Sequence, residues 1–339
     1  MSVTAPATRR RGTESLHDFV IPLLTPFTGD LDVDHDALRH NVRHTLAIPG
    51  CGALYVGSVY QEFWTLTVSE RIELLETVSD EAAGRAPIVA GISSASVREA
   101  IELARAAERA RADLLMLWPP LWGPRDFPGV RRFYECVAAE TSLPLFIYST
   151  TLQELGFYLD PQMIEELADG IPNVVGVKDG SGNVSTFLSL TEHLGDRLAI
   201  GTPFEEYWAL ARGAYPRQAT DFLFGASRPM YMQSQARPYV AETLDLIRRG
   251  EQEKAFASLA AVRDLVGLQM ESFRRGVHPV SLVKYACFLL GQRGPEVRPP
   301  TPVLAESERG RIQEVLSKVG LLGSDAVSPS EHAVGALGR

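Results

Sequence analysis

Several signatures are missing from this sequence of 339 residues, and each absence argues against a class of function. Acidic residues outnumber basic ones, giving a formal net charge of −9, so we expect no binding to nucleic acid or to an anionic membrane. The three cysteines form no CxxC pair, which favours reduced thiols over a disulfide framework. No GxGxxG follows the first apolar run and no GxSxG is present, which argues against a dinucleotide-binding domain and a serine hydrolase.

Neither end of the sequence carries a secretory or membrane-spanning segment. Residues 1–11 are polar and end in three arginines with no apolar stretch behind them, which is not the pattern of a signal peptide. The last residues are rich in Ser, Gly and Ala. We therefore expect a cytoplasmic protein with flexible tails at residues 1–15 and 323–339.

Eight short apolar runs alternate with segments of helical periodicity. Continuous apolar runs are typical of strands buried on both faces, as in a parallel sheet covered by helices. Eight such units favour an α/β fold of the (β/α)8 TIM barrel type over an open doubly wound sheet. The runs are Phe19–Thr25, Ala53–Gly57, Pro87–Gly91, Leu114–Trp118, Leu145–Tyr148, Val174–Lys178, Leu198–Gly201 and Asp221–Phe224.

Amphipathic segments follow the eighth run, without a Pro- or Ser-rich linker before them. We expect the barrel to occupy residues 16–230 and a C-terminal helical extension, packed on the barrel, to occupy residues 231–322. Such an extension would cap the barrel or form subunit contacts. Its predicted helical segments are Ser234–Arg249, Gln252–Met270, Val280–Leu290 and Glu306–Val319.

Two reactive side chains end consecutive apolar runs. Catalytic groups of this fold lie at the carboxyl ends of the strands, where Lys178 and Tyr148 would converge. A partly desolvated lysine has a lowered pKa and can attack a carbonyl, and a neighbouring tyrosine can move protons. The alternative is structural: Lys178 would pair with Asp179 or a nearby glutamate, and Tyr148 would bond a buried partner. Position alone favours this structural alternative.

A resemblance to a known family changes that balance. The stretch VVGVKDGSGN at Val174–Asn183 resembles the Schiff-base lysine segment of the dihydrodipicolinate synthase / N-acetylneuraminate lyase family of class I aldolases. The resemblance implies a TIM barrel, imine formation on Lys178, proton relay by Tyr148, no metal or organic cofactor, and a homotetramer or homodimer. Similar motifs occur in family order at Ile21–Phe27, Gly50–Glu70, Leu145–Tyr148, His278–Lys284, Leu289–Gly291 and Arg298–Pro300.

The sequence departs from the family in the residues that surround the lysine. The glycine-rich loop that grips the 2-oxo acid carboxylate reads SVYQE at Ser58–Glu62, so Val59 stands where the synthase has a relay threonine. Backbone amides of Val59 and Tyr60 would still suit a carboxylate, and Glu62 is assigned to loop structure. The family's tyrosine pair after the fourth strand is replaced by PPLWG, and no arginine follows Tyr148 at the expected place. We therefore do not expect the lysine-pathway synthase itself.

These patterns predict a Schiff-base lyase that acts on pyruvate or a related 2-oxo acid, cleaving a C–C bond or condensing the acid with an aldehyde. Alternatives within the family are a 2-keto-3-deoxy sugar acid dehydratase and an aromatic hydratase-aldolase. Met116–Pro128 resembles the latter, and Tyr60 and Trp122 would suit an apolar acceptor. A non-catalytic regulator that binds a 2-oxo or amino acid is the alternative of another class. The predicted substrate-binding residues are Ser58, Val59, Tyr60, Trp122, Gly201 and Leu223.

Overall fold

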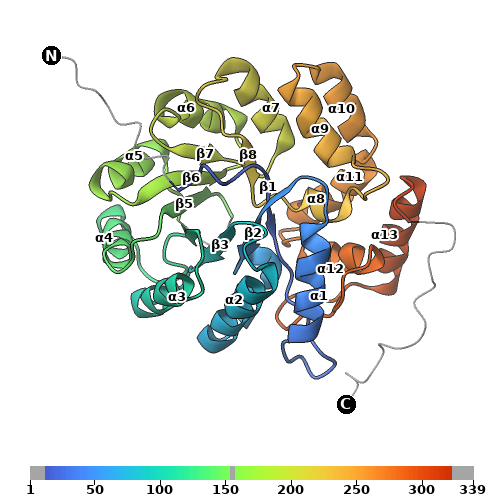
Figure 1. Ribbon diagram of the computed structural model, residues 1–339, viewed down its shortest axis with the longest axis horizontal. Coiled ribbons are helices and arrows are strands. Elements are labelled where there is room, and N and C mark those ends of the chain that lie inside the picture. Colours follow the sequence, from blue (N-terminus) through green and yellow to red (C-terminus); the bar gives the residue numbers. More distant parts are fainter. Residues whose placement is uncertain (1–11, 153–156, 323–339) are drawn as a thin grey trace.

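Eight parallel strands form the centre of the molecule in the computed structural model, which describes residues 12–152 and 157–322 (Figure 1). Each strand is a short apolar segment, as the sequence predicts. The strands are β1 (Asp18–Pro22), β2 (Cys51–Val56), β3 (Ile88–Gly91), β4 (Leu114–Leu117), β5 (Leu145–Thr150), β6 (Val174–Gly180), β7 (Ala199–Gly201) and β8 (Phe222–Phe224).

The strands close into a barrel in sequence order. Parallel ladders join each strand to the next from β1 to β7, and β8 pairs with β1. The amide of Phe224 donates to the carbonyl of Thr202, 2.9 Å away, across the remaining seam. The predicted (β/α)8 TIM barrel is therefore confirmed.

Helices follow the strands and form the outer ring. Most of them begin at a side chain that caps the free amides of the first turn, and Thr67 with Glu70 forms a complete capping box. The ring helices are α1 (His35–Leu46), α2 (Val68–Ala82), α3 (Val97–Arg109), α4 (Phe127–Ala138), α5 (Pro161–Gly170), α6 (Val184–Leu194) and α7 (Glu205–Ala214).

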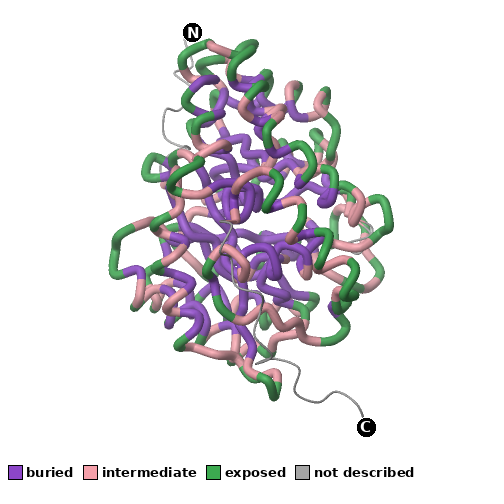
Figure 2. Tube along the Cα trace, turned by 90° about the vertical axis from the view of Figure 1, so that its right-hand side faces the viewer, coloured by how far each residue is buried: buried purple, intermediate pink, exposed green. Residues whose placement is uncertain are grey.

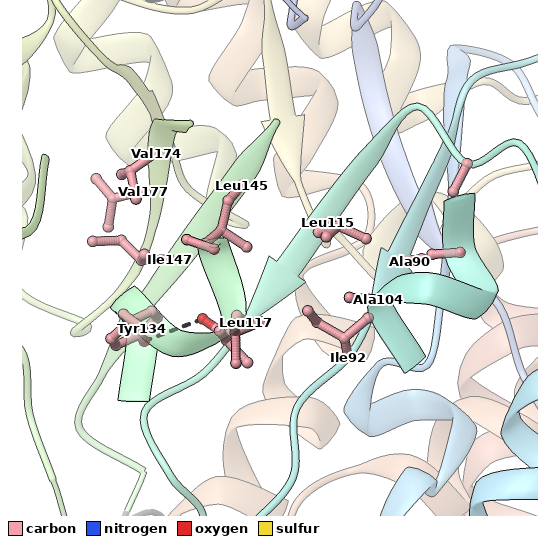
Figure 3. Close-up of a cluster of buried hydrophobic side chains, with 14 of the residues drawn as sticks. Ala90, Ile92, Ala104, Leu115, Leu117, Tyr134, Leu145, Ile147, Val174 and Val177 are labelled. Atoms are coloured by element: carbon pink, nitrogen blue, oxygen red, sulfur yellow. Dashed lines mark hydrogen bonds between the residues drawn. The ribbon is translucent and has the colours of Figure 1, made fainter. Parts of the chain in front are cut away.

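Alternate side chains of the strands supply two separate cores. Those that point outward pack against the helices, as Leu115, Ile147 and Val177 do in Figure 3. Those that point inward fill the barrel, and they include Phe146, Tyr148 and Phe224. Figure 2 shows the resulting buried centre beneath an exposed outer surface. The inward set includes Tyr148, one of the two residues expected at the carboxyl ends of the strands.

The C-terminal helices pack against one side of the barrel (Figure 1), with a shared apolar cluster between them and β1 and β8. One predicted segment, Gln252–Met270, is in fact two helices, because the chain leaves the helix at Ala261 and Val262. The helices are α8 (Arg228–Tyr231), α9 (Tyr239–Arg248), α10 (Gln252–Ala260), α11 (Arg263–Arg274), α12 (Val280–Leu289) and α13 (Glu306–Lys318).

The predicted tails lie outside the described residues, except that residues 12–15 are described at the amino end. None of the helices within residues 12–152 and 157–322 is long and apolar enough to cross a membrane.

Candidate active site

Lys178 lies on the inner face of β6, in register with Tyr148 of β5 and Gly201 of β7. Only 7% of the residue is exposed. Burial lowers the pKa of its ammonium group to about 7, and no carboxylate in the described residues offsets that loss of hydration. Asp179 points to the opposite face, where it accepts a hydrogen bond of 3.1 Å from the Ser181 hydroxyl. The structural alternative, in which Lys178 pairs with Asp179, therefore does not hold.

Tyr148 is the neighbour of the lysine nitrogen. The Lys178 Nζ atom lies 4.5 Å from the centroid of the Tyr148 ring, so the two side chains converge as their strand-end positions predict. Burial raises the pKa of the Tyr148 hydroxyl, which is therefore a neutral phenol at physiological pH. A neutral amine can attack a carbonyl, and an adjacent phenol can supply a proton.

An aromatic wall of Tyr55, Phe63 and Trp118 borders this pair. The Trp118 ring lies 4.6 Å from that of Tyr148 and 5.6 Å from that of Phe63, measured between centroids. Its indole also bonds the Tyr55 hydroxyl. The ring of Tyr55 lies 6.0 Å from Lys178 Nζ. These rings exclude water from the lysine, which is the physical cause of its lowered pKa.

Two glycines keep space open beside the lysine. A Cβ atom on Gly225 would lie 2.5 Å from Lys178 Nζ, and the backbone there has a φ of +71° that favours glycine. Gly201, a predicted substrate-binding residue, is the ladder partner of Lys178, and a Cβ there would lie 2.9 Å from the Phe224 Cβ. A side chain at Gly225 would therefore crowd the amine, and one at Gly201 would press on Phe224 inside the barrel.

The loop after β2 holds the next three predicted binding residues. It forms a short 3-10 helix, Val59–Gln61, whose cap is Ser58: the Ser58 hydroxyl oxygen accepts from the Tyr60 amide at 3.2 Å. Val59 is partly buried against apolar neighbours. The Tyr60 hydroxyl accepts a 2.8 Å hydrogen bond from Ser227. The Tyr60 amide is thus already used within the loop.

Glu62 ends this short helix and is fully buried. Its carboxylate lies 2.7 Å from the ammonium nitrogen of Lys284 on α12 and accepts from the Arg298 amide at 3.1 Å. These bonds tie the loop to the C-terminal extension. This geometry agrees with the structural role expected of Glu62.

The extension also places His278 near the lysine. Its ring packs edge-on against Tyr60, with centroids 4.8 Å apart, and against Phe273 at 5.5 Å. Burial, followed by the charge of Lys178, lowers the pKa of the His278 imidazole to about 3, so the ring is neutral. Its Nδ1 atom is buried without a hydrogen-bond partner in the described residues. A polar group of this kind is available to a ligand.

Trp122 and Leu223 stand apart from this cluster. Trp122 is 81% exposed in the loop between β4 and α4. Leu223 points outward from β8 into the apolar cluster shared with the C-terminal helices, whereas Phe222 and Phe224 point inward. Any contact of Leu223 with a ligand would therefore involve its backbone. The substrate-binding roles of both residues stay predictions.

Sequence reasoning missed Thr150, Tyr55 and His278. Thr150 has a recognisable signal, because alternation along a strand places it on the same face as Tyr148. The predicted strand stopped at Tyr148, but β5 continues to Thr150. Tyr55 is an inward residue of β2. Whether such a residue lines the pocket or fills the core depends on packing, which the sequence does not give. His278 comes from the extension, 100 residues after Lys178, and although it begins a motif similar to the family, that motif did not place it at the site.

Comparisons with known proteins agree with this geometry. The model of the dihydrodipicolinate synthetase family matches residues 15–214. A probable 5-dehydro-4-deoxyglucarate dehydratase of Methylobacterium radiotolerans is 29% identical over 300 residues, which cover 86% of this chain and 92% of the relative. A 4-hydroxy-tetrahydrodipicolinate synthase of Acidithiobacillus ferrooxidans is 28% identical over 304 residues, covering 89% and 98% of the two chains.

Solved structures share the fold. The E. coli prophage protein YagE, solved in complex with pyruvate, is similar with a TM-score of 0.76 and 21% identity, covering 89% of this chain and 98% of its own. Dihydrodipicolinate synthase of Aquifex aeolicus has a TM-score of 0.78 and 21% identity, with coverage of 91% and 100%. The family match extends over more than half of the chain and includes Tyr148 and Lys178. The chain therefore belongs to the dihydrodipicolinate synthetase family and is an enzyme of the lyase class.

Proposed function

We propose that the enzyme forms a Schiff base between Lys178 and a 2-oxo acid such as pyruvate. The observation that carries the proposal is the buried amine of Lys178, with a pKa of about 7 and Tyr148 beside it. Half of such an amine is neutral at pH 7, whereas an exposed lysine is almost fully protonated. The chemistry would use no cofactor, since the protonated imine is itself the electron sink.

The steps follow from this arrangement. The neutral amine adds to the carbonyl, and Tyr148 gives its proton to the departing carbinolamine hydroxyl, so that water leaves and the protonated imine and a Tyr148 phenolate remain. The phenolate takes a proton from the neighbouring carbon, which gives an enamine, and the enamine expels a group from the next carbon. Tyr148 donates its proton to that leaving group when it is a hydroxyl, giving water and a phenolate. In aldol cleavage, the Tyr148 phenolate formed together with the imine accepts the proton of the substrate hydroxyl as the C–C bond breaks, which releases an aldehyde and leaves the enamine.

The relatives favour dehydration of a keto-deoxy sugar acid among the alternatives. Two of the matched relatives are named as probable 5-dehydro-4-deoxyglucarate dehydratases, at 29% and 28% identity. An aldol reaction of pyruvate with an aldehyde remains the second candidate, because the aromatic wall of Tyr55, Phe63 and Trp118 suits an apolar acceptor. Cytoplasmic location and a homotetramer or homodimer complete the proposal.

The experiment traps the covalent intermediate. Wild-type enzyme and Lys178→Ala are incubated with pyruvate, reduced with borohydride, and analysed by intact mass. We expect a pyruvate-derived adduct on the wild type and none on the variant. Absence of an adduct with any 2-oxo acid would overturn the proposal and favour the non-catalytic regulator. Turnover of 5-dehydro-4-deoxyglucarate, or of pyruvate with aliphatic and aromatic aldehydes, then separates dehydration from aldol chemistry.

A further inference from the structure

Tyr148 needs a partner that can bond it in two protonation states. As a buried phenol it holds its proton firmly, because burial raises its pKa. When it gives that proton to a leaving group, a phenolate remains in a site with little water. A buried phenolate is costly unless a donor bonds it. A residue of this chain must therefore donate a hydrogen bond to the phenolate.

The loop threonine of the family cannot be this donor, because Val59 stands at its position here and has no hydroxyl. Ser58, beside it, uses its hydroxyl oxygen to cap the short helix through the Tyr60 amide. Ser149 points away from Tyr148, on the opposite face of β5, and donates to the Leu159 carbonyl at 2.6 Å. Neither serine is a hydrogen-bond partner of the Tyr148 hydroxyl, and Val59 has no hydroxyl to offer.

Thr150 has the required geometry. It lies two residues beyond Tyr148 on the same face of β5 and is buried, so its hydroxyl faces that of Tyr148 and favours the ionised phenol. Its oxygen also accepts from the Leu152 amide at 3.3 Å, which leaves a second lone pair and its hydrogen for other partners. The same hydroxyl lies 3.2 Å from the carbonyl oxygen of Gly180, its ladder partner on β6. The phenol lies directly over that glycine, since a Cβ atom on Gly180 would be 2.7 Å from the Tyr148 oxygen. The Tyr148 hydroxyl, the Thr150 hydroxyl and the Gly180 carbonyl therefore lie next to one another.

We propose that Thr150 is a switchable hydrogen-bond partner of Tyr148 and replaces the missing loop threonine. While Tyr148 is a phenol, Thr150 accepts its hydrogen bond and donates its own hydrogen to the Gly180 carbonyl. When Tyr148 becomes a phenolate, the Thr150 hydroxyl turns its hydrogen to the phenolate oxygen. Thr150 itself gains and loses no proton. It acts through Tyr148, so it is a positioning residue, and this role rests on the proposed Schiff-base function.

The test separates imine formation from proton transfer. Each variant is trapped with pyruvate and borohydride, and exchange of the pyruvate methyl protons in D2O is followed by NMR across pH. Thr150→Val removes the hydroxyl at nearly constant shape, and Thr150→Ser restores it. Thr151→Val is the matched control, because Thr151 is exposed and donates to the Ser181 carbonyl at 3.0 Å. Tyr148→Phe sets the rate without the phenol.

We expect Thr150→Val to form the full adduct but to slow exchange roughly 10- to 100-fold, as loss of a hydrogen bond to a charged group implies. Thr150→Ser should recover most of the rate, and Thr151→Val should match the wild type. Exchange by Thr150→Val at the wild-type rate, loss of its adduct, or failure of serine to rescue would each overturn the role of Thr150. An absent wild-type adduct would instead overturn the Schiff-base proposal.

Discussion

The molecule buries two lysines in very different surroundings. Lys178 is 7% exposed and Lys284 is 1% exposed, so both have lost most of their hydration. Lys284 lies 2.7 Å from the Glu62 carboxylate and also donates to the Glu296 carbonyl. Lys178 faces aromatic rings, and among the described residues no ion pair compensates it.

This difference separates a structural lysine from a reactive one. A buried charge with a carboxylate partner stays protonated and holds two parts of the chain together, whereas an unpaired buried amine loses its proton readily. Burial alone lowers the pKa of both side chains, but Glu62 acts in the opposite direction on Lys284. The partner, more than the burial, decides the role.

The largest effect on stability is expected at the paired lysine. Lys284→Met leaves the Glu62 carboxylate buried without its counter-charge, which should lower the free energy of unfolding by about 3–5 kcal/mol. Urea denaturation measures this loss. The double variant Lys284→Met/Glu62→Gln removes the stranded charge as well and should recover at least half of it. A double variant as unstable as the single one would show that the pair acts through packing alone.

The unpaired lysine should give an effect of opposite sign. Lys178→Met removes a desolvated amine, so we expect the free energy of unfolding to rise by roughly 1–3 kcal/mol at pH 7. The folded pKa of about 7 lies below the value of roughly 10.4 in the unfolded chain, which therefore binds more protons between these pH values. The cost of Lys178 is complete below pH 7 and fades as the pH rises to 10. Denaturation at pH 7 and pH 10 should show the gain shrinking, and a constant gain would contradict the pKa.

The smallest effect concerns reactivity. The rate of imine formation with pyruvate should be half-maximal near pH 7 and fall about tenfold for each further unit of acidity, because only the neutral amine attacks. Trapping with cyanoborohydride and timed mass analysis measures this rate between pH 5 and 9. A rate that still rises about tenfold per pH unit at pH 9 would mean that Lys178 is as basic as an exposed lysine.

Much of the fold followed from local patterns. The eight strands were predictable because buried parallel strands are continuous apolar runs, and Lys178 and Tyr148 were visible as polar residues at the ends of two of them. The two-residue extension of β5 was not predictable, since Ser149 and Thr150 are polar and resemble a loop. Their burial depends on the ladder with Asp179 and Gly180 of β6.

Features that join distant segments were beyond sequence reasoning. Glu62 and Lys284 are 222 residues apart, so nothing local pairs them. Tyr60 was expected to suit an apolar acceptor, but its hydroxyl is held by Ser227, which in turn accepts from Gln269 at 3.0 Å. Such contacts arise from the packing of the extension on the barrel, and periodicity says nothing about them.

The missing side chain of Gly225 has a consequence for how the enzyme can change. During addition to a carbonyl, the lysine nitrogen becomes bonded to a tetrahedral carbon, and this carbon needs free volume beside the nitrogen. A methyl group on Gly225 would lie 2.5 Å from that nitrogen, inside the volume that any new substituent on the amine needs. A side chain at position 225 would therefore compete with the reacting carbon for space and would also strain a backbone whose φ of +71° favours glycine.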